Sequence, residues 1–342
     1  MSVDMSVINT EAIVQDILAS IEREREREII ARRFGLFDRK ETLEQIGELL
    51  GITRERVRQL EKSVMTRLRT TSGELPHITE VEATLLSAIE AAGQTARITT
   101  LGAELTAENS RTDQSRLAFL TELTPGISAI SEDDNFYQAA GNAKVHDEAA
   151  IKTEVAKLVD TIAKNGKPME TRDLCQAASM PNDVYVTALA STSKQLATLN
   201  GRWGLVKWPT VNPKNIRDKI YVILSENGKH MHFNEIAEAI KASDFKRKDV
   251  TTQAIHNELI KDKRFVLIGR GIYALKEWGY KKGTVADIIA EVLREAGEPL
   301  HRDEIVKRVL KSRFVKETTI LLNLQSKTQF KRVAKATYEL AE

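Results

Sequence analysis

Four side chains that can hydrogen-bond to DNA bases cluster at the start of one expected helix. They are Arg54, Glu55, Arg58 and Gln59. Arginine can bond both major-groove acceptors of guanine, glutamine pairs with adenine, and a carboxylate accepts from the amino group of cytosine. In a helix-turn-helix, residues at the N-terminal end of the second helix reach base edges in the major groove. We therefore expect these four residues to read DNA bases.

A second set of residues suits contact with phosphates. Thr42 and Thr53 stand at expected helix N-termini, where main-chain N–H groups favour an anion. Arg56 and Lys62 are cations on the same helix as the base-reading set, and we expect them to contact the DNA backbone. Charge alone does not show that the helix binds DNA, because an arginine-rich helix is also typical of a solvated face in a helical bundle.

Local capping signals define the elements that position these side chains. Thr42 is an expected N-cap, with Gln45 three residues later as in a capping box. Gly51 is expected to end that helix and Thr53 to cap the next. Upstream, we expect residues 10–34 to form one long helix. The expected apolar faces of the two short helices consist of Leu43, Ile46, Leu49 and Leu50, and of Val57, Leu60, Val64 and Leu68.

Residues 29–36, 42–61 and 67–69 resemble region four of the sigma-70 family. The resemblance implies recognition of the promoter −35 element and docking on the β flap of bacterial RNA polymerase. It also implies that the four residues named first are base-reading positions and that Thr42 and Thr53 contact the backbone. No aromatic-rich segment resembles the strand-melting region two, so we expect the protein not to open promoters alone.

The rest of the chain indicates four repeats of helix, glycine break, two further helices and a β-hairpin. The hairpins are expected to end on residues 134–139, 201–208, 271–278 and 336–341. This order predicts a mostly α fold with small β-wings: an N-terminal helix-turn-helix followed by tandem winged helices. Residues 215–278 resemble the HARE-HTH winged helix of the RNA polymerase delta subunit. The expected domains are 1–73, 78–141, 147–209, 214–279 and 283–342.

The charge of the chain is unevenly distributed, although its net charge is only +2. Residues 74–160 contain fifteen acidic and six basic residues, and residues 301–335 contain ten basic and three acidic. Because phosphates attract basic surfaces, we expect the C-terminal repeats to hold flanking DNA and the acidic repeat to face protein. The alternative is that these basic residues are ordinary solvated side chains with no role in binding DNA. The expected secondary basic surface consists of Lys246, Arg247, Lys248, Arg264, Arg270, Lys331 and Arg332.

The sequence favours a DNA-binding transcription regulator over an enzyme. We find no nucleotide-binding loop, nucleophile elbow or carboxylate cluster, and we expect no catalytic residue, metal, cofactor or small-molecule substrate. His232 and His301 are expected at helix starts, and Cys175 in a core. With one cysteine, no eighteen-residue apolar run and no signal-like N-terminus, we expect a cytoplasmic, nucleoid-associated protein.

The expected partners are double-stranded, promoter-like DNA and the core of bacterial RNA polymerase. Two other functions remain open at this point. The first is a polymerase-binding adaptor or anti-initiation factor that does not read DNA sequence. The second is an architectural DNA-binding protein, which would show steep salt dependence with little sequence preference.

Overall fold

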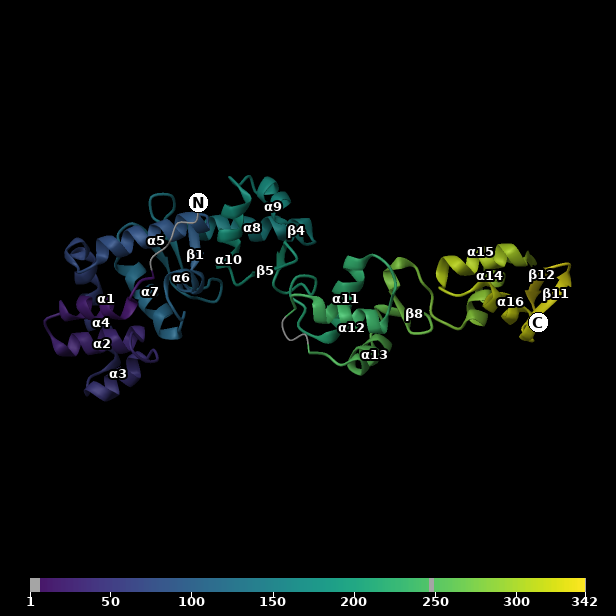
Figure 1. Ribbon diagram of the computed structural model, residues 1–342, viewed down its shortest axis with the longest axis horizontal. Helices are drawn as coiled ribbons and strands as arrows, with labels where there is room; N and C mark the ends of the chain where they lie inside the picture. The colour runs from purple at the N-terminus through teal and green to yellow at the C-terminus, as the bar shows by residue number, and fades with distance from the viewer. Residues whose placement is uncertain (1–6, 246–248, 342) are drawn as a thin grey trace. The chain divides into compact units, whose positions relative to one another are not determined.

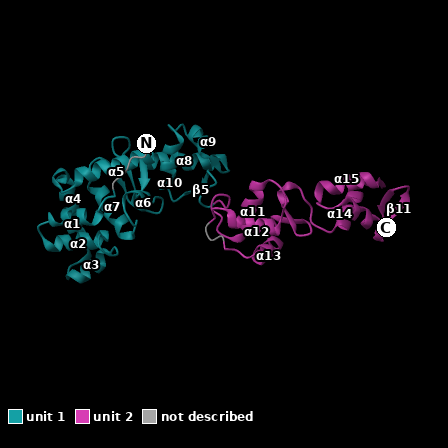
Figure 2. Cartoon of the chain, in the orientation of Figure 1, with its two compact units in different colours: residues 1–207 teal, residues 208–342 magenta. Residues whose placement is uncertain are grey.

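The computed structural model describes residues 7–245 and 249–341 (Figure 1). The chain divides into two compact units, Met1–Lys207 and Trp208–Glu342 (Figure 2). Helices dominate the described residues, and the strands form small antiparallel sheets. No described helix is both long enough and apolar enough to cross a lipid bilayer.

The first unit opens with four helices, and the expected single helix over residues 10–34 is wrong. Ser20 follows the first helix and its Oγ donates to the carbonyl of Ile17 at 2.6 Å, so residues 20–23 form a break. The helices are α1 (Thr10–Ala19), α2 (Glu24–Phe34), α3 (Leu43–Leu50) and α4 (Arg54–Thr70).

The break separates two helices that contribute differently to the cores. Ile21, within the break, packs with residues of α1. On α2, the adjacent residues Ile29 and Ile30 belong to different clusters: Ile29 packs with Ile46 and Val57, and Ile30 packs in the core that contains α1. The helix α2 therefore contributes to both cores.

Two repeats of one order of elements follow in the first unit: helix, short strand, helix, helix and two strands. A 3₁₀ turn, η1 (Ser72–Glu74), precedes them. The first repeat consists of α5 (Ile78–Ala92), β1 (Thr95–Arg97), α6 (Ile98–Leu105), α7 (Arg111–Leu123), β2 (Ile127–Ile130) and β3 (Ala139–Asn142). The second consists of α8 (Glu148–Asn165), β4 (Met169–Glu170), α9 (Thr171–Ala177), α10 (Asp183–Thr192), β5 (Leu196–Leu199) and β6 (Arg202–Leu205).

The second unit contains the same order twice. The third repeat consists of α11 (Ile216–Asn227), β7 (Met231–His232), α12 (Phe233–Ala242), α13 (Thr252–Lys261), β8 (Phe265–Gly269) and β9 (Ile272–Leu275), with a 3₁₀ turn, η2 (Lys276–Trp278), after it. The fourth consists of α14 (Val285–Ala296), β10 (Leu300–His301), α15 (Arg302–Ser312), α16 (Glu317–Ser326), β11 (Phe330–Ala334) and β12 (Thr337–Leu340).

Each repeat has one three-stranded antiparallel sheet in which the last strand lies in the middle, as in the order β1-β3-β2. The short first strand of each sheet was not expected from sequence, because two or three residues show no alternation. The strand expected over residues 134–139 is also wrong, since β3 begins at Ala139. The Asp133 carboxylate accepts from the N–H groups of Asn135 and Phe136 at 2.7 Å each, which folds this stretch into a turn.

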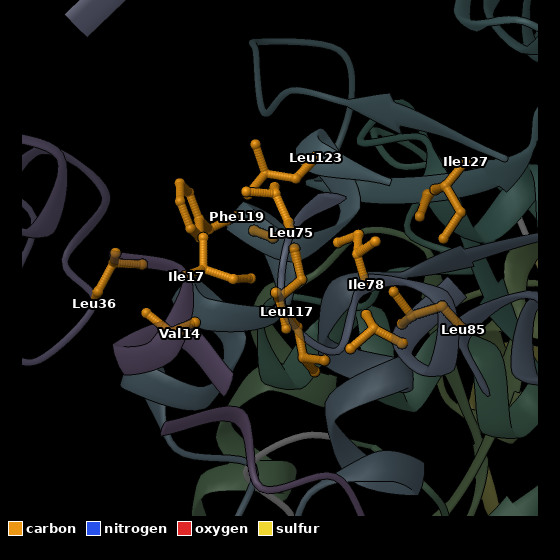
Figure 3. Packing of buried hydrophobic residues seen from close by; sticks show 14 of the residues in the cluster. Val14, Ile17, Leu36, Leu75, Ile78, Leu85, Leu117, Phe119, Leu123 and Ile127 are labelled. Carbon is orange, nitrogen blue, oxygen red and sulfur yellow. The ribbon is translucent and has the colours of Figure 1, made fainter. Parts of the chain in front are cut away.

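Three of the N-terminal helices, α1, α2 and α4, share one hydrophobic core with the first repeat (Figure 3). Phe119 of α7 is fully buried, and its ring meets that of Phe34 of α2 edge-on at 5.1 Å between centroids. Arg116, also on α7 and 7% exposed, donates to the carbonyl of Leu36 at 2.8 Å and to the Glu11 carboxylate at 2.8 Å. The helix-turn-helix is therefore joined to the first repeat by buried contacts.

Candidate nucleic-acid interface

The turn between α3 and α4 is fixed by the caps expected from the sequence. Thr42 accepts from the N–H of Gln45 at 3.2 Å, and its own N–H donates to the Gln45 side chain at 2.9 Å, which completes a capping box. Gly51 ends α3 in the left-handed conformation with φ 64°. Thr53 caps α4 by accepting from the N–H of Arg56 at 3.2 Å. These local predictions are confirmed.

Sequence reasoning missed a second glycine that this turn requires. Gly47 lies buried in α3, and a Cβ there would come within 2.7 Å of the carbonyl oxygen of Ile52 and 3.4 Å of the N atom of Arg54. Both atoms belong to the backbone that leads into α4. The close approach of α3 to the start of α4 therefore depends on the absence of a side chain at this position.

We expect Gly47→Ala to lower the free energy of unfolding of the α3–α4 segment by about 1–3 kcal/mol, since overpacking against backbone forces the turn to move. Gly73→Ala is the matched control. A Cβ at Gly73 meets nothing within 4 Å, so a change below about 0.5 kcal/mol is expected. Hydrogen exchange of the α3 amides measures both, and equal protection in the two variants would contradict the packing argument.

The buried face of α4 contains Val57, Val64 and Leu68, as expected, and also Met65, which the sequence analysis omitted. Leu60 is partly buried against the small core of Ile29, Ile46 and Val57. On α3 the expectation for Leu49 is wrong, because this side chain is 55% exposed.

The opposite face of α4 presents the expected polar side chains together. The six exposed residues are Arg54, Glu55, Arg56, Arg58, Gln59 and Lys62. The first turns of the helix carry three of the arginines, and the side chains of all three are exposed. Within the first unit, this end of α4 is open to solvent.

Hydrogen bonds connect the exposed side chains along the helix. The Arg58 guanidinium donates to both oxygens of Glu55, at 2.8 and 2.7 Å, and Gln59 donates to the same carboxylate at 3.3 Å. The Arg58 hydrogen bonds lower the pKa of the Glu55 carboxyl, so it is anionic at neutral pH. Exposed ion pairs of this kind contribute little to stability, so a ligand that approaches the helix can open the pair at little cost.

A groove of about 560 Å³ borders α4 from Arg58 to Arg69. Its far side belongs to the first repeat and carries Glu122 and Glu132, while α4 contributes Arg58, Lys62 and Arg69. Arg69 is already paired with Glu122 at 2.7 Å. The uncompensated positive charge of α4 therefore lies toward its N-terminal half.

The residues of the expected secondary basic surface differ in whether their charge is neutralised by nearby carboxylates. The Arg264 guanidinium is held by Asp262 at 2.8 Å and by Asp218 at 3.1 Å, so its charge is satisfied within the third repeat. Arg270, Lys331 and Arg332 are exposed. The remaining three expected residues, Lys246, Arg247 and Lys248, lie outside the described residues.

Two of the histidines, His232 and His301, and the single cysteine have structural roles. His232 and His301 are N-caps of α12 and α15, accepting from main-chain N–H groups at 3.3 and 3.4 Å. Cys175 is buried, which raises the pKa of its thiol, and Sγ donates to the carbonyl of Met180 at 3.3 Å. Among the described residues, no three His, Cys, Asp or Glu side chains gather in a way that could hold a metal ion.

The segment that contains α2, α3 and α4 matches a known protein family. Residues 23–70 match the family model of sigma-70, region 4. The match begins at the N-cap of α2 and ends with the last residue of α4, so α1 lies outside it. We call residues 23–70 the region-4 module.

The region-4 module is also similar to curated sigma factors. The RNA polymerase sigma factor SigA of Bacillus sp is 44% identical over 57 residues, which cover 16% of this chain and 15% of that protein. RpoD of Helicobacter pylori is 48% identical over 63 residues, covering 16% and 9%. Arabidopsis thaliana sigB is 50% identical over 46 residues, covering 13% and 8%. The chain thus spans less than a sixth of the length of these relatives, and the matches support a sigma-factor-like, non-catalytic, DNA-binding role for this module.

Proposed function

We propose that the protein is a transcription regulator whose region-4 module reads a −35-like element in duplex DNA. Arg54, Glu55, Arg58 and Gln59 would enter the major groove, with Arg58 and Arg54 on guanine. The observation that carries the proposal is their exposure together at the N-terminal end of a capped, rigidly supported α4. The sigma-factor matches to the same residues support it.

Thr42, Thr53, Arg56 and Lys62 would hold the phosphates on either side. The two threonines cap the N-termini of α3 and α4 and are exposed, as are the two cations, and helix N-termini favour a bound phosphate. We expect Arg56→Ala and Lys62→Ala to weaken binding about equally for all duplex sequences and to reduce the slope of log affinity against log salt by about one each. Titrations at several salt concentrations measure this, and a change in sequence preference would instead make either residue a base reader.

Selection of bound duplexes from a random-sequence library tests the proposal as a whole. The full chain is expected to enrich one motif, and the variant Arg54→Ala/Arg58→Ala to lose it while keeping its fold by circular dichroism. Recovery of no motif by the unaltered chain would overturn sequence reading. Binding that remained strong and salt-dependent would then favour the architectural alternative.

The curated relatives are named as sigma factors of RNA polymerase, so we further propose that core polymerase is a partner of this chain. The β flap is the expected docking site. Pull-down of purified bacterial core polymerase with the full chain tests this, and failure to bind at low salt would remove polymerase from the proposal. Binding that persisted in the Arg54→Ala/Arg58→Ala variant, with no motif recovered by the unaltered chain, would favour the adaptor function.

The four repeats would act as winged-helix modules at 78–141, 147–209, 214–279 and 283–342, after a module at 1–73. Their support is the repeated order of helix, strand, two helices and hairpin, with the last strand central in each sheet. The third would be the HARE-HTH-like one. Because the first repeat shares a core with the region-4 module, we propose that these two act as one rigid body.

A further inference from the structure

The hairpins of the four repeats share one architecture but differ sharply in charge. The β2–β3 segment of the first repeat has no cation and three acidic residues. The β5–β6 and β8–β9 segments have one cation each, Arg202 and Arg270. The β11–β12 segment of the fourth repeat has three cations and one acidic residue, and a fourth cation is the C-cap of α16 just before it. We call these four the basic hairpin: Lys327, Lys331, Arg332 and Lys335.

The basic hairpin is exposed and only weakly neutralised. All four side chains lie on the surface, and four of the five residues of β11 are exposed. Lys331 has a distant carboxylate partner, Glu339, at 3.9 Å, while the Arg332 guanidinium is steadied by the carbonyl of Ala334 at 3.1 Å. Among the described residues, no carboxylate within 4.0 Å is recorded for the other three cations.

The cations of the basic hairpin differ in this respect from other cations of the second unit that have close carboxylate partners. Lys281 is bonded to Glu291 and Glu295 at 2.9 and 2.7 Å, and Arg308 to Glu304 at 2.7 Å. The helix that precedes the basic hairpin, α16, has one acidic residue, Glu317 at its first position. Uncompensated positive charge therefore gathers at the C-terminal end of α16 and along the hairpin.

We propose that the basic hairpin is a second nucleic-acid site, which binds the phosphate backbone of duplex DNA without reading its sequence. A ladder of cations with one acidic neighbour, Glu339, suits closely spaced phosphates, and three of the four cations are lysines, which act as point charges. Duplex DNA is favoured over other polyanions because the region-4 module of the same chain is proposed to bind it. Tethering would then raise the local concentration of DNA at the hairpin.

The test replaces all four residues with glutamine in the full chain and measures binding to a random-sequence duplex. The expected result is a salt slope reduced by about two to four, since each phosphate contact contributes about 0.9. Affinity at low salt should fall at least tenfold. The measurement is repeated with Arg54→Ala/Arg58→Ala present, so that failure of the hairpin site and failure of the region-4 site give separate results.

The matched control removes four cations of the same unit that already have carboxylate partners: Arg217, Lys281, Arg302 and Arg308. Both variants change the net charge equally, so the control should leave the salt slope within about one of the unaltered chain. An equal loss in both variants would overturn the proposal, because general charge would then explain it. The proposal would also be overturned if the hairpin variant kept the salt slope of the unaltered chain. It would be overturned as well if this variant lost binding to single-stranded RNA but not to duplex DNA.

Discussion

Arg58→Ala is expected to reduce the affinity for the selected DNA motif about 5- to 150-fold, the range for losing one bidentate base contact. The reason lies in the exposed position of this guanidinium on α4, where only Glu55 holds it in the free protein. Affinity for duplexes that carry a substitution at the guanine contacted by Arg58 should fall much less. Competition titrations with the motif and its single-base variants measure the difference.

Two further variants distinguish a base contact by Arg58 from a general effect of charge. Arg172→Ala removes the same charge from an exposed position on α9 and should leave the preference for the motif unchanged. Glu55→Gln frees Arg58 from its carboxylate partner while keeping the length of the side chain, so the base contact of Arg58 should persist while the base contact of Glu55 itself changes. If Arg172→Ala and Arg58→Ala reduced affinity equally on every sequence, Arg58 would be a phosphate contact and not a base reader.

The largest expected loss of stability comes from Phe119→Ala. This ring is fully buried in the shared core and packs on Phe34 of α2, so its removal should lower the free energy of unfolding by about 3–5 kcal/mol. Because the core belongs to both modules, amides of α4 and of α5 should lose protection from hydrogen exchange together. Exchange measured peptide by peptide reports on each helix.

Leu49→Ala is the matched control for this variant. Leu49 is 55% exposed on α3, and its truncation should change stability by less than about 0.5 kcal/mol. The outcome that contradicts the shared core is loss of protection in α5, α6 and α7 while α4 keeps its original protection. The region-4 module would then fold independently of the first repeat.

The parts of the candidate site that were predictable from sequence depend on local chemistry. Thr42, Thr53 and Gly51 fix helix ends through contacts within three or four residues, so the start of α4 and its outward polar face followed from spacing alone. The resemblance to sigma region four agreed with the same boundaries. The glycine at 47 was missed because its neighbour, the carbonyl of Ile52, becomes visible only when the turn is folded.

The parts that could not be predicted depend on distant contacts. The break at residues 20–23 was not predicted, because the buried contacts of Ile21 with α1 and the shared core form only in the folded chain. The pair of Arg69 and Glu122 joins residues 53 positions apart, as part of an interface that sequence periodicity does not reveal. The two-residue strands β4, β7 and β10 exist only because a hairpin far along the chain supplies a central partner.

Base reading by α4 requires that its leading side chains enter the major groove of the duplex. Methylation interference at guanine N7, which lies in that groove, tests this directly on the selected motif. We predict that methylation of one or two guanines blocks binding of the unaltered chain, and that the interference at one of them disappears in Arg58→Ala. Binding that tolerates methylation at every guanine, with interference confined to phosphate ethylation, would contradict base reading by α4.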